Sequence, residues 1–313
     1  MAARNILVIK LGALGDLFLA MDAFQAIRSH HAGDRISLLT RPAFAKFAAD
    51  LPWFDEVITD LTPRGLRIDQ WLAMRRRLRA GNFARVYDLQ CNERTAAYHR
   101  LLGPGRRPEW VGMARGCSHP WPEYRTANLA VPERQLRMIA TAGVPRLDRA
   151  VDLSWLDAPF EGLPALPERF VLLVPGCAPH RLEKRWPAAR YADLARLLAE
   201  RRGLGSVVIG TAADQASIDE LCAAAPAVVN LCGRTSLKQL GALARRARGV
   251  VGNDTGPVHI TAAVGAPTLV VMSGHSDPVR MRPRGPDVDV VQQANLADLD
   301  AERVLAALRL RAD

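Results

Sequence analysis

Residues 249–259 read GVVGNDTGPVH and pass from a predicted strand to a predicted helix within a few positions. The apolar residues 249–251 indicate the strand, and residues 260–264 continue the helix. The first amide groups of a helix lack internal partners and carry the positive end of its dipole, so such a junction binds anions. Gly256 lets a phosphate approach the backbone, and Pro257 gives up no hydrogen bond in the first turn. The stretch therefore predicts a phosphate site.

The same order of strand and helix repeats outward from this junction. Short apolar runs predict strands at residues 6–9, 35–39, 57–58, 86–89, 170–174, 206–209, 228–231, 250–251 and 268–272. Longer periodic patterns predict helices at residues 17–29, 43–50, 68–79, 94–102, 188–200, 216–224, 236–246, 258–264 and 296–310. This βαβ rhythm is typical of parallel sheets with right-handed crossovers.

The length of the chain favours two domains. Its 313 residues, 49% of them hydrophobic, can bury two ordinary cores. Residues 103–122 are rich in Pro, Gly and Trp and predict loops, and residues 159–167 predict a linker. We therefore expect an α/β protein with two doubly wound domains, residues 1–158 and residues 159–313. The last helix is a candidate to pack back on the first domain.

The net charge of +10 is concentrated in the first half, which carries 23 Lys and Arg against 16 Asp and Glu in residues 1–158. Such a bias suits an acidic substrate, an anionic membrane surface or nucleic acid. The densest run, residues 75–79, lies on a predicted helix and also fits a solvated face. No apolar run approaches the roughly 18 residues of a membrane span, and no signal peptide pattern begins the chain, so we expect a cytoplasmic protein.

The loops after the predicted strands hold the candidates for chemistry, because ligands of doubly wound domains bind at the carboxyl ends of strands. Residues 10–16 read KLGALGD and lack the full Gly-x-Gly-x-x-Gly pattern of nicotinamide dehydrogenases. Asp16 fits a helix cap and a catalytic carboxylate equally. Lys184 follows another strand and fits a phosphate-binding cation or a solvated lysine. Asp214 fits ribose binding or helix capping.

Histidine, cysteine and known catalytic motifs give no indication of another kind of chemistry. His259 falls in the first turn of a predicted helix, where a histidine is more often structural than catalytic. The five cysteines are scattered without a Cys-x-x-Cys pair, which favours reduced thiols. No spacing of metal ligands, nucleophile elbow or Walker lysine is found in the sequence, so we expect no metal.

Taken together and in order, these segments resemble the heptosyltransferase family of bacterial lipopolysaccharide synthesis, glycosyltransferase family 9. The resemblance covers nearly the whole chain. Its segments are residues 6–16, 87–94, 175–176, 184–187, 210–214, 231–237, 253–263 and 274–278. The family implies a GT-B fold, in which two Rossmann-like domains face each other across a cleft. It also implies an inverting transfer of heptose from ADP-heptose to an anionic lipopolysaccharide inner-core acceptor, without a metal or other cofactor.

The resemblance assigns roles position by position. Asp16 matches the catalytic base, which takes a proton from the acceptor hydroxyl. Gly12, Gly15, Asn92 and Arg94 are candidates for the acceptor side. On the donor side, Lys184 and the backbone of Thr255 and Gly256 match the groups that bind the diphosphate. Asp214 matches a carboxylate that holds the ribose, and Thr235 matches an adenine contact. Asp254 and His259 match residues that line the same pocket.

These expectations have competitors. The nearest enzymes are a GT-B transferase that uses another nucleotide sugar and a hydrolysing nucleotide-sugar epimerase. The epimerase usually needs further carboxylates and histidines at the site, and the sequence does not show their pattern. A non-catalytic nucleotide-binding module would need the phosphate site without the base. Retention of both Asp16 and Lys184 favours the enzyme, which we expect to act as a monomer, to bind no nucleic acid and to contact the inner face of the inner membrane peripherally.

Overall fold

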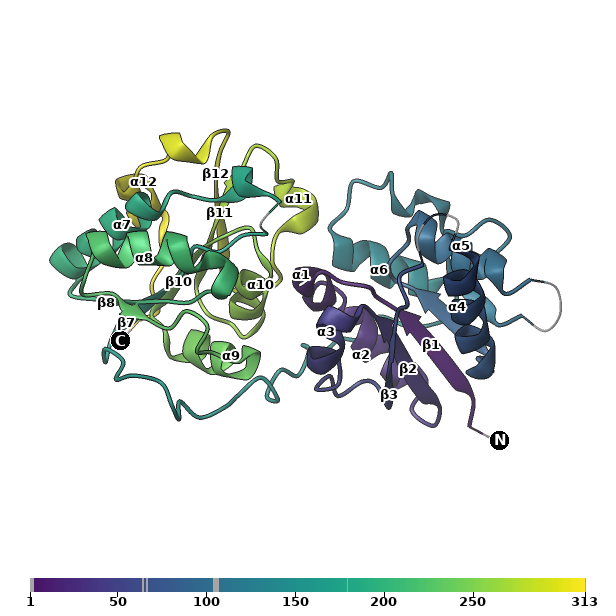
Figure 1. Cartoon of the computed structure of the whole chain (residues 1–313). Coiled ribbons are helices and arrows are strands. Elements are labelled where there is room, and N and C mark those ends of the chain that lie inside the picture. Colours follow the sequence, from purple (N-terminus) through teal and green to yellow (C-terminus); the bar gives the residue numbers. More distant parts are fainter. Residues whose placement is uncertain (1–2, 64, 66, 104–106, 179, 313) are drawn as a thin grey trace. The chain divides into compact units, whose positions relative to one another are not determined.

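A computed structural model describes residues 3–63, 65, 67–103, 107–178 and 180–312. The chain forms two compact units, Met1–Val151 and Asp152–Asp313. Each unit contains one six-stranded parallel sheet with helices packed against it (Figure 1). The α/β fold class with two doubly wound units is thereby confirmed. The sequence had predicted the division between residues 158 and 159.

The first sheet has the order β3-β2-β1-β4-β5-β6 and is parallel throughout. Its strands are β1 (Asn5–Ile9), β2 (Arg35–Thr40), β3 (Glu56–Thr59), β4 (Arg85–Asp88), β5 (Glu109–Gly112) and β6 (His119–Pro120). Its helices are α1 (Leu14–Phe18), α2 (Met21–His30), α3 (Pro42–Ala48), α4 (Ile68–Ala80), α5 (Glu93–Leu101), η1 (Pro122–Tyr124) and α6 (Val131–Ala140). The strand order reverses between β1 and β4, which makes the loops after these two strands the expected ligand position.

The second sheet repeats this plan with the order β12-β11-β10-β7-β8-β9. Its strands are β7 (Phe170–Val174), β8 (Gly205–Val208), β9 (Val229–Asn230), β10 (Gly249–Asn253), β11 (Thr268–Ser273) and β12 (Val288–Gln293). Its helices are η2 (Leu182–Lys184), α7 (Ala188–Arg202), η3 (Ala212–Asp214), α8 (Gln215–Ala224), α9 (Leu237–Arg246), α10 (Gly256–Ala263), α11 (Pro278–Met281), η4 (Leu296–Asp298) and α12 (Ala301–Ala307). Its order reverses between β7 and β10.

Several predicted boundaries were wrong. Residues 103–122 are not all loops, since they contain β5 and the two-residue edge strand β6. The helix expected at residues 17–29 is two helices, α1 and α2. The helix expected at residues 296–310 is only η4 and α12, because the chain becomes extended at Leu308. Here α12 packs against α7 of its own unit.

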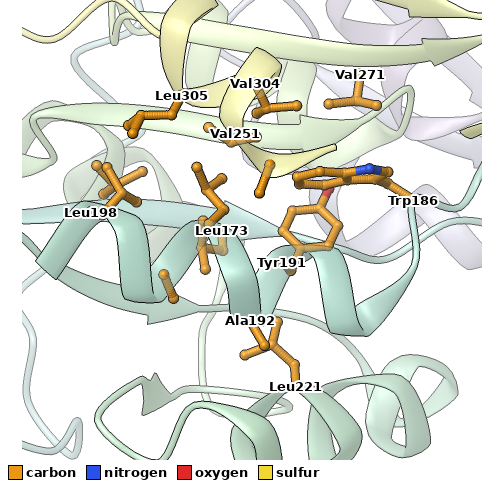
Figure 2. Packing of buried hydrophobic residues seen from close by; sticks show 14 of the residues in the cluster. Leu173, Trp186, Tyr191, Ala192, Leu198, Leu221, Val251, Val271, Val304 and Leu305 are labelled. Atoms are coloured by element: carbon orange, nitrogen blue, oxygen red, sulfur yellow. The ribbon is translucent and has the colours of Figure 1, made fainter. Parts of the chain in front are cut away.

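The core of the second unit joins its sheet to α7, α8 and α12 (Figure 2). Leu173 and Val251 come from neighbouring strands, and Leu198 and Leu305 come from the helices that cover them. Trp186 is fully buried, and its indole N–H donates to the carbonyl of Leu299 at 2.9 Å. Because the Trp186 ring is buried and its indole N–H has a partner, this side chain holds the loop before α7 in place.

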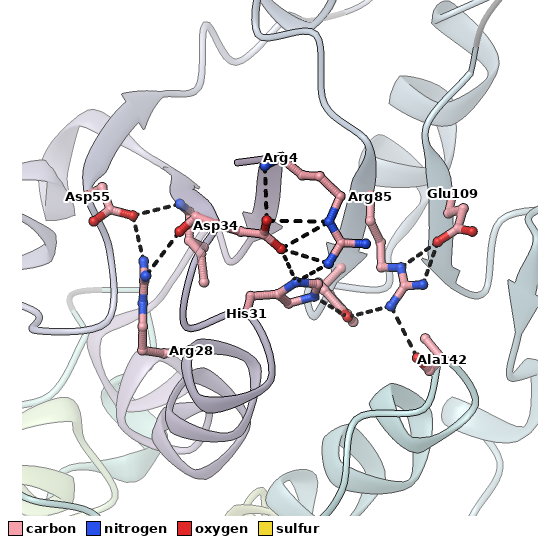
Figure 3. A network of polar contacts seen from close by, with 10 residues as sticks. Arg4, Arg28, His31, Asp34, Asp55, Arg85, Glu109 and Ala142 are labelled. Atoms are coloured by element: carbon pink, nitrogen blue, oxygen red, sulfur yellow. Dashed lines mark hydrogen bonds and ion pairs between the residues drawn. The ribbon is translucent and has the colours of Figure 1, made fainter. Parts of the chain in front are cut away.

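The first unit carries a network of charged side chains at the amino edge of its sheet (Figure 3). Asp34 accepts hydrogen bonds from the backbone and guanidinium of Arg4 and from His31. His31 also contacts the hydroxyl of Tyr87, to which Arg85 donates at 3.1 Å. The network therefore links the starts of β1, β2 and β4. Among the described helices, none is both long and apolar enough to cross a membrane.

Candidate functional site

Asn253 joins the two strand ends at the reversal point of the second sheet. Its side-chain amide donates to the carbonyl of Pro175 at 2.7 Å, and its oxygen accepts from the Trp186 backbone N–H and the Tyr191 hydroxyl at 3.1 Å each. All of this side chain is buried. Because a buried amide with every partner in place specifies one geometry, Asn253 fixes the loop after β7 against the end of β10.

Lys184 and Asp254 meet in this corner. The Lys184 ammonium lies 2.6 Å from Asp254 Oδ2, and the Ser276 hydroxyl donates to the same oxygen at 2.7 Å. The side chains of Asp254 and Lys184 are 5% and 16% exposed. One carboxylate oxygen thus holds a cation from the β7 loop and a hydroxyl from the β11 loop. The ammonium keeps further N–H donors beyond this bond, because it carries three.

The start of α10 lies directly after this carboxylate. Thr255 is the N-cap in an extended conformation, and Pro257 stands in the first turn. The Thr255 side chain makes no capping bond. His259 is buried in the first turn of the helix. The predicted anion-binding junction therefore has a lysine ammonium beside the positive end of a helix.

Asp214 lies against the same loop from the next strand. One oxygen accepts from the backbone N–H and hydroxyl of Thr211 at 3.0 and 2.9 Å, as in a helix cap. The other lies 3.6 Å from Arg185. A Cβ on Gly176 would come within 2.9–3.0 Å of the Asp214 carboxyl, so only glycine fits there without a shift. The hydrogen bonds from Thr211 thus support the interpretation of Asp214 as a helix-capping residue. Its role toward ribose stays a prediction.

Thr235 is half-buried immediately before Ser236, the N-cap of α9. Ser236 and Gln239 form a capping box, in which the Gln239 backbone N–H donates to the Ser236 hydroxyl at 3.1 Å. The loop that holds Thr235 follows β9, so it lies at the same carboxyl edge as the loops after β7 and β10. The adenine contact of Thr235 stays a prediction.

Asp16 stands in the first turn of α1 in the first unit. Its carboxylate accepts from the Ala13 backbone N–H at 2.8 Å, a contact made within three residues. Gly12 has φ +103°, and the Phe44 ring lies 2.2 Å from the position of a Cβ there. Gly15 is buried in α1. The local loop therefore fixes the position of Asp16 and cannot accept a larger residue at position 12.

Arg94 and Asn92 follow β4, the neighbour of β1. Asn92 caps α5, accepting from the Thr95 backbone N–H at 3.0 Å. Arg94 lies 3.4 Å from Asp60, a fully buried carboxylate that also accepts from the Tyr98 hydroxyl at 2.5 Å. Burial and this bond raise the pKa of Tyr98. Arg94 is thus an anchored, partly exposed cation at the carboxyl edge, and Asn92 caps α5 at the same edge. Their roles toward an acceptor stay predictions.

Several residues at these strand ends were missed by the sequence reasoning. Asn253 and Ser276 lay inside quoted motifs without a role, because their partners are distant in sequence. Lys10 is buried, donates to the Leu89 carbonyl at 3.1 Å and adjoins the buried Asp88. Burial raises the pKa of Asp88 to about 6, although the Cys91 backbone N–H donates to it. A polar residue at the end of a buried strand was the available signal.

The arginine run of α4 is largely engaged by the protein itself. Arg75 donates to the carbonyl of Leu101, Arg77 to that of Thr59, and Arg79 to that of Leu102. These bonds satisfy carbonyls at the end of α5 and of β3. Arg75, Arg77 and Arg79 therefore have structural roles, which weakens the interpretation of the run as an acceptor site. No cluster of metal-ligating side chains occurs within the described residues.

Comparisons with known proteins show the family of the chain and its fold. The model of the family described as glycosyltransferase family 9 (heptosyltransferase) matches residues 71–306. Lipooligosaccharide heptosyltransferase 2 of Haemophilus influenzae is 37% identical over 100 residues, which cover 30% of this chain and 28% of that protein. Lipooligosaccharide heptosyltransferase 2 of Haemophilus ducreyi is 26% identical over 302 residues, 88% of this chain and 84% of that protein. The structure of Escherichia coli ADP-heptose lipopolysaccharide heptosyltransferase II superimposes with a TM-score of 0.75, at 21% identity and with 97% of both chains covered.

Proposed function

This chain belongs to glycosyltransferase family 9, the heptosyltransferases, and from that premise we propose that it transfers heptose from ADP-heptose to an anionic lipopolysaccharide inner-core acceptor. The observation that supports the donor side best is the Lys184 ammonium held 2.6 Å from Asp254 at the start of α10. The names of the matched proteins support heptose as the sugar, and the Escherichia coli protein is named for ADP-heptose.

In the proposed reaction Asp16 removes the proton of the acceptor hydroxyl. The oxygen then forms a bond to the anomeric carbon while the bond from that carbon to the diphosphate breaks. Attack from the face opposite the nucleotide inverts the configuration, and ADP leaves with the bonding electrons. The hydrogen bond from the Ala13 backbone N–H supports this role of Asp16, because it orients the carboxylate before any acceptor binds.

Lys184 and the first amides of α10 stabilise the departing diphosphate in this proposal. Asp254, which the Ser276 hydroxyl orients, holds the ammonium so that its remaining N–H groups meet phosphate oxygens. Thr255 and Gly256 supply the backbone dipole, and such fixed charges stabilise the transition state without rearrangement. Asp214, Thr235 and His259 complete the donor pocket. We propose that no metal or other cofactor takes part, and full transfer in excess EDTA would support this.

The acceptor side of the proposal uses Gly12, Gly15, Asn92 and Arg94. Arg94 is held at 3.4 Å by Asp60 and is 30% exposed, so it retains donors for a carboxylate or phosphate of the acceptor. Gly12 and Gly15 keep the loop around Asp16 compact. We further propose that the protein acts as a cytoplasmic monomer that meets its lipid-linked acceptor at the membrane surface.

A donor screen tests the proposed reaction. The protein is mixed with ADP-heptose, UDP-sugars or GDP-sugars and a panel of lipid A core acceptors, and products are identified by mass spectrometry. Transfer from ADP-heptose alone is expected, with inverted configuration at the new bond. Transfer from a UDP or GDP sugar would favour a GT-B transferase that uses another nucleotide sugar. Binding of ADP without transfer to any acceptor would favour a non-catalytic module.

The base is tested by Asp16→Asn, which keeps the size of the side chain. We expect kcat to fall by roughly 10³-fold, within the range that general bases contribute. Calorimetry should give an unchanged Kd for ADP, because Asp16 belongs to the other unit from Lys184. Wild-type turnover by this variant would remove Asp16 from the mechanism.

A further inference from the structure

One face of α4 combines exposed apolar and basic side chains. Ile68 is 67% exposed and Leu72 is 48% exposed, and both are among the few large hydrophobic residues on the described surface. Arg76 and Arg79 are also exposed. A rotation of 100° per residue places these four residues within about 80° of each other around the helix. The face therefore passes from apolar to basic along its length.

Other side chains of α4 anchor the helix to the first unit. Met74 and Leu78 are buried in the core of the first unit, and Trp71 packs edge-on against Tyr98. Arg75 bonds to the carbonyl of Leu101, which ties α4 to α5 beside it (Figure 1). The exposed stripe is thus presented by a helix that is anchored along its inner side.

The guanidinium group of Arg76 is available to a partner. Arg76 is engaged by no hydrogen bond or ion pair within the described residues. Arg79 is exposed as well, and it donates to the carbonyl of Leu102. The available charge of Arg76 beside two exposed aliphatic side chains complements an anionic lipid surface, where aliphatic groups enter the acyl boundary and guanidinium groups meet phosphates.

The direction of α4 places the apolar end of the stripe close to the chemistry. A helix that follows a parallel strand begins at the carboxyl edge of its sheet, and α4 follows β3. Ile68 therefore lies toward the edge that carries Asp60 and Arg94, and Arg79 lies toward the amino edge. A surface that covers this face would meet the unit beside its acceptor residues.

We propose that the stripe Ile68, Leu72, Arg76 and Arg79 docks the protein on an anionic phospholipid membrane. The assignment rests on the proposed function for its biological sense, because a lipid-linked acceptor resides in such a membrane. Docking restricts the search for the acceptor to two dimensions and orients the first unit before an acceptor molecule is bound.

Vesicle co-sedimentation of the full chain tests the docking. Vesicles of phosphatidylcholine with 30% phosphatidylglycerol, free of acceptor, should bind the wild type, and pure phosphatidylcholine should bind it much less. Arg76→Gln should weaken binding about fivefold, the change expected for one cation near an anionic surface. Ile68→Ser with Leu72→Ser should weaken it about tenfold. Equal binding to both vesicles, or wild-type binding by the variant with all three substitutions, would overturn the proposal.

Matched variants separate docking from general effects. Arg202→Gln removes one exposed charge from the second unit, and Val279→Ser removes an exposed aliphatic side chain there, so both should bind vesicles like the wild type. Equal losses in these variants would overturn the assignment to α4. A wild-type dimer that dissociates on Ile68→Ser with Leu72→Ser would assign the face to a second copy and would also overturn it.

Activity in detergent keeps this test distinct from the proposed function. With a detergent-dispersed acceptor, the α4 variants should transfer heptose at the wild-type rate, because no membrane has to be found. Vesicle binding with no transfer in detergent would contradict the proposed function and leave docking standing. Transfer in detergent without vesicle binding would do the reverse.

Discussion

At the amino edge of the first sheet Asp34 accepts bonds from Arg4 and His31, whereas at the carboxyl edge of the second sheet Asp254 accepts bonds from Lys184 and Ser276. Both carboxylates are paired, and their side chains are only 10% and 5% exposed. The amino-edge network continues from His31 through Tyr87 and Arg85 to Glu109 (Figure 3). At the carboxyl edge of the second sheet, the Lys184 ammonium and the first amides of α10 still have N–H groups that can bind a ligand. Spare hydrogen-bonding capacity distinguishes the binding edge from the structural edge.

The largest expected effect is on the amide that supports the binding edge. Asn253→Ala leaves the Trp186 N–H, the Tyr191 hydroxyl and the Pro175 carbonyl without this partner in a buried site. We expect the free energy of unfolding to fall by about 3 kcal/mol in urea titrations. Asn5→Ala at the amino edge, which removes one half-buried bond to Gly81, should cost less than about 1 kcal/mol. Equal costs would contradict the contrast.

Lys184→Met should lower kcat/KM for the donor about 100-fold, which corresponds to about 2.7 kcal/mol of transition-state stabilisation. Steady-state kinetics with varied ADP-heptose measures this. The matched change Arg85→Met removes a cation from the amino edge and should leave kcat/KM unchanged while lowering stability. The distinction between the edges fails if both variants lose activity alike.

Asp34→Asn should lower the free energy of unfolding by about 2 kcal/mol at pH 7. Burial opposes ionisation, but hydrogen bonds from Arg4 and His31 outweigh it and hold the pKa of Asp34 well below its usual range. The stabilisation is therefore complete above the unfolded pKa of about 3.9 and is lost as the pH falls toward the folded value. Denaturant titrations at pH 7 and pH 3 should show a smaller gap between wild type and variant at pH 3. A constant gap would contradict this linkage.

The smallest expected effects on stability come from replacing two glycines, one at each edge. Gly176→Ala places a methyl group within 3.0 Å of the Asp214 carboxyl and should cost about 1.5 kcal/mol and weaken donor binding. Gly33→Ala, before β2 at the amino edge, meets no atom within 4 Å and should change stability by less than about 0.5 kcal/mol. Thermal unfolding and ADP calorimetry measure both changes, and a neutral Gly176→Ala would show that the loop after β7 can shift.

The sequence predicted the strands and helices that have strong local periodicity, and it placed Lys184 and Asp254 at strand ends. It failed where the signal is short or non-local. The two residues of β6 carry no period, and Asn253 binds Pro175 from 78 positions away. Arg75 looked like part of a basic surface because its bond to the Leu101 carbonyl depends on the packing of α4 on α5. Contacts of this kind exist only after the fold has formed.

The hydrogen bond from the Ala13 backbone N–H to Asp16 spans three residues, and the contacts of Asp254 with Lys184 and Ser276 stay within the second unit. Each half of the proposed chemistry is thus built from its own unit's residues. Acceptor choice and donor choice can then evolve separately, by exchange of whole units between relatives. A chimera that joins residues 1–151 to the second unit of another family member would inherit a complete base and a complete phosphate site.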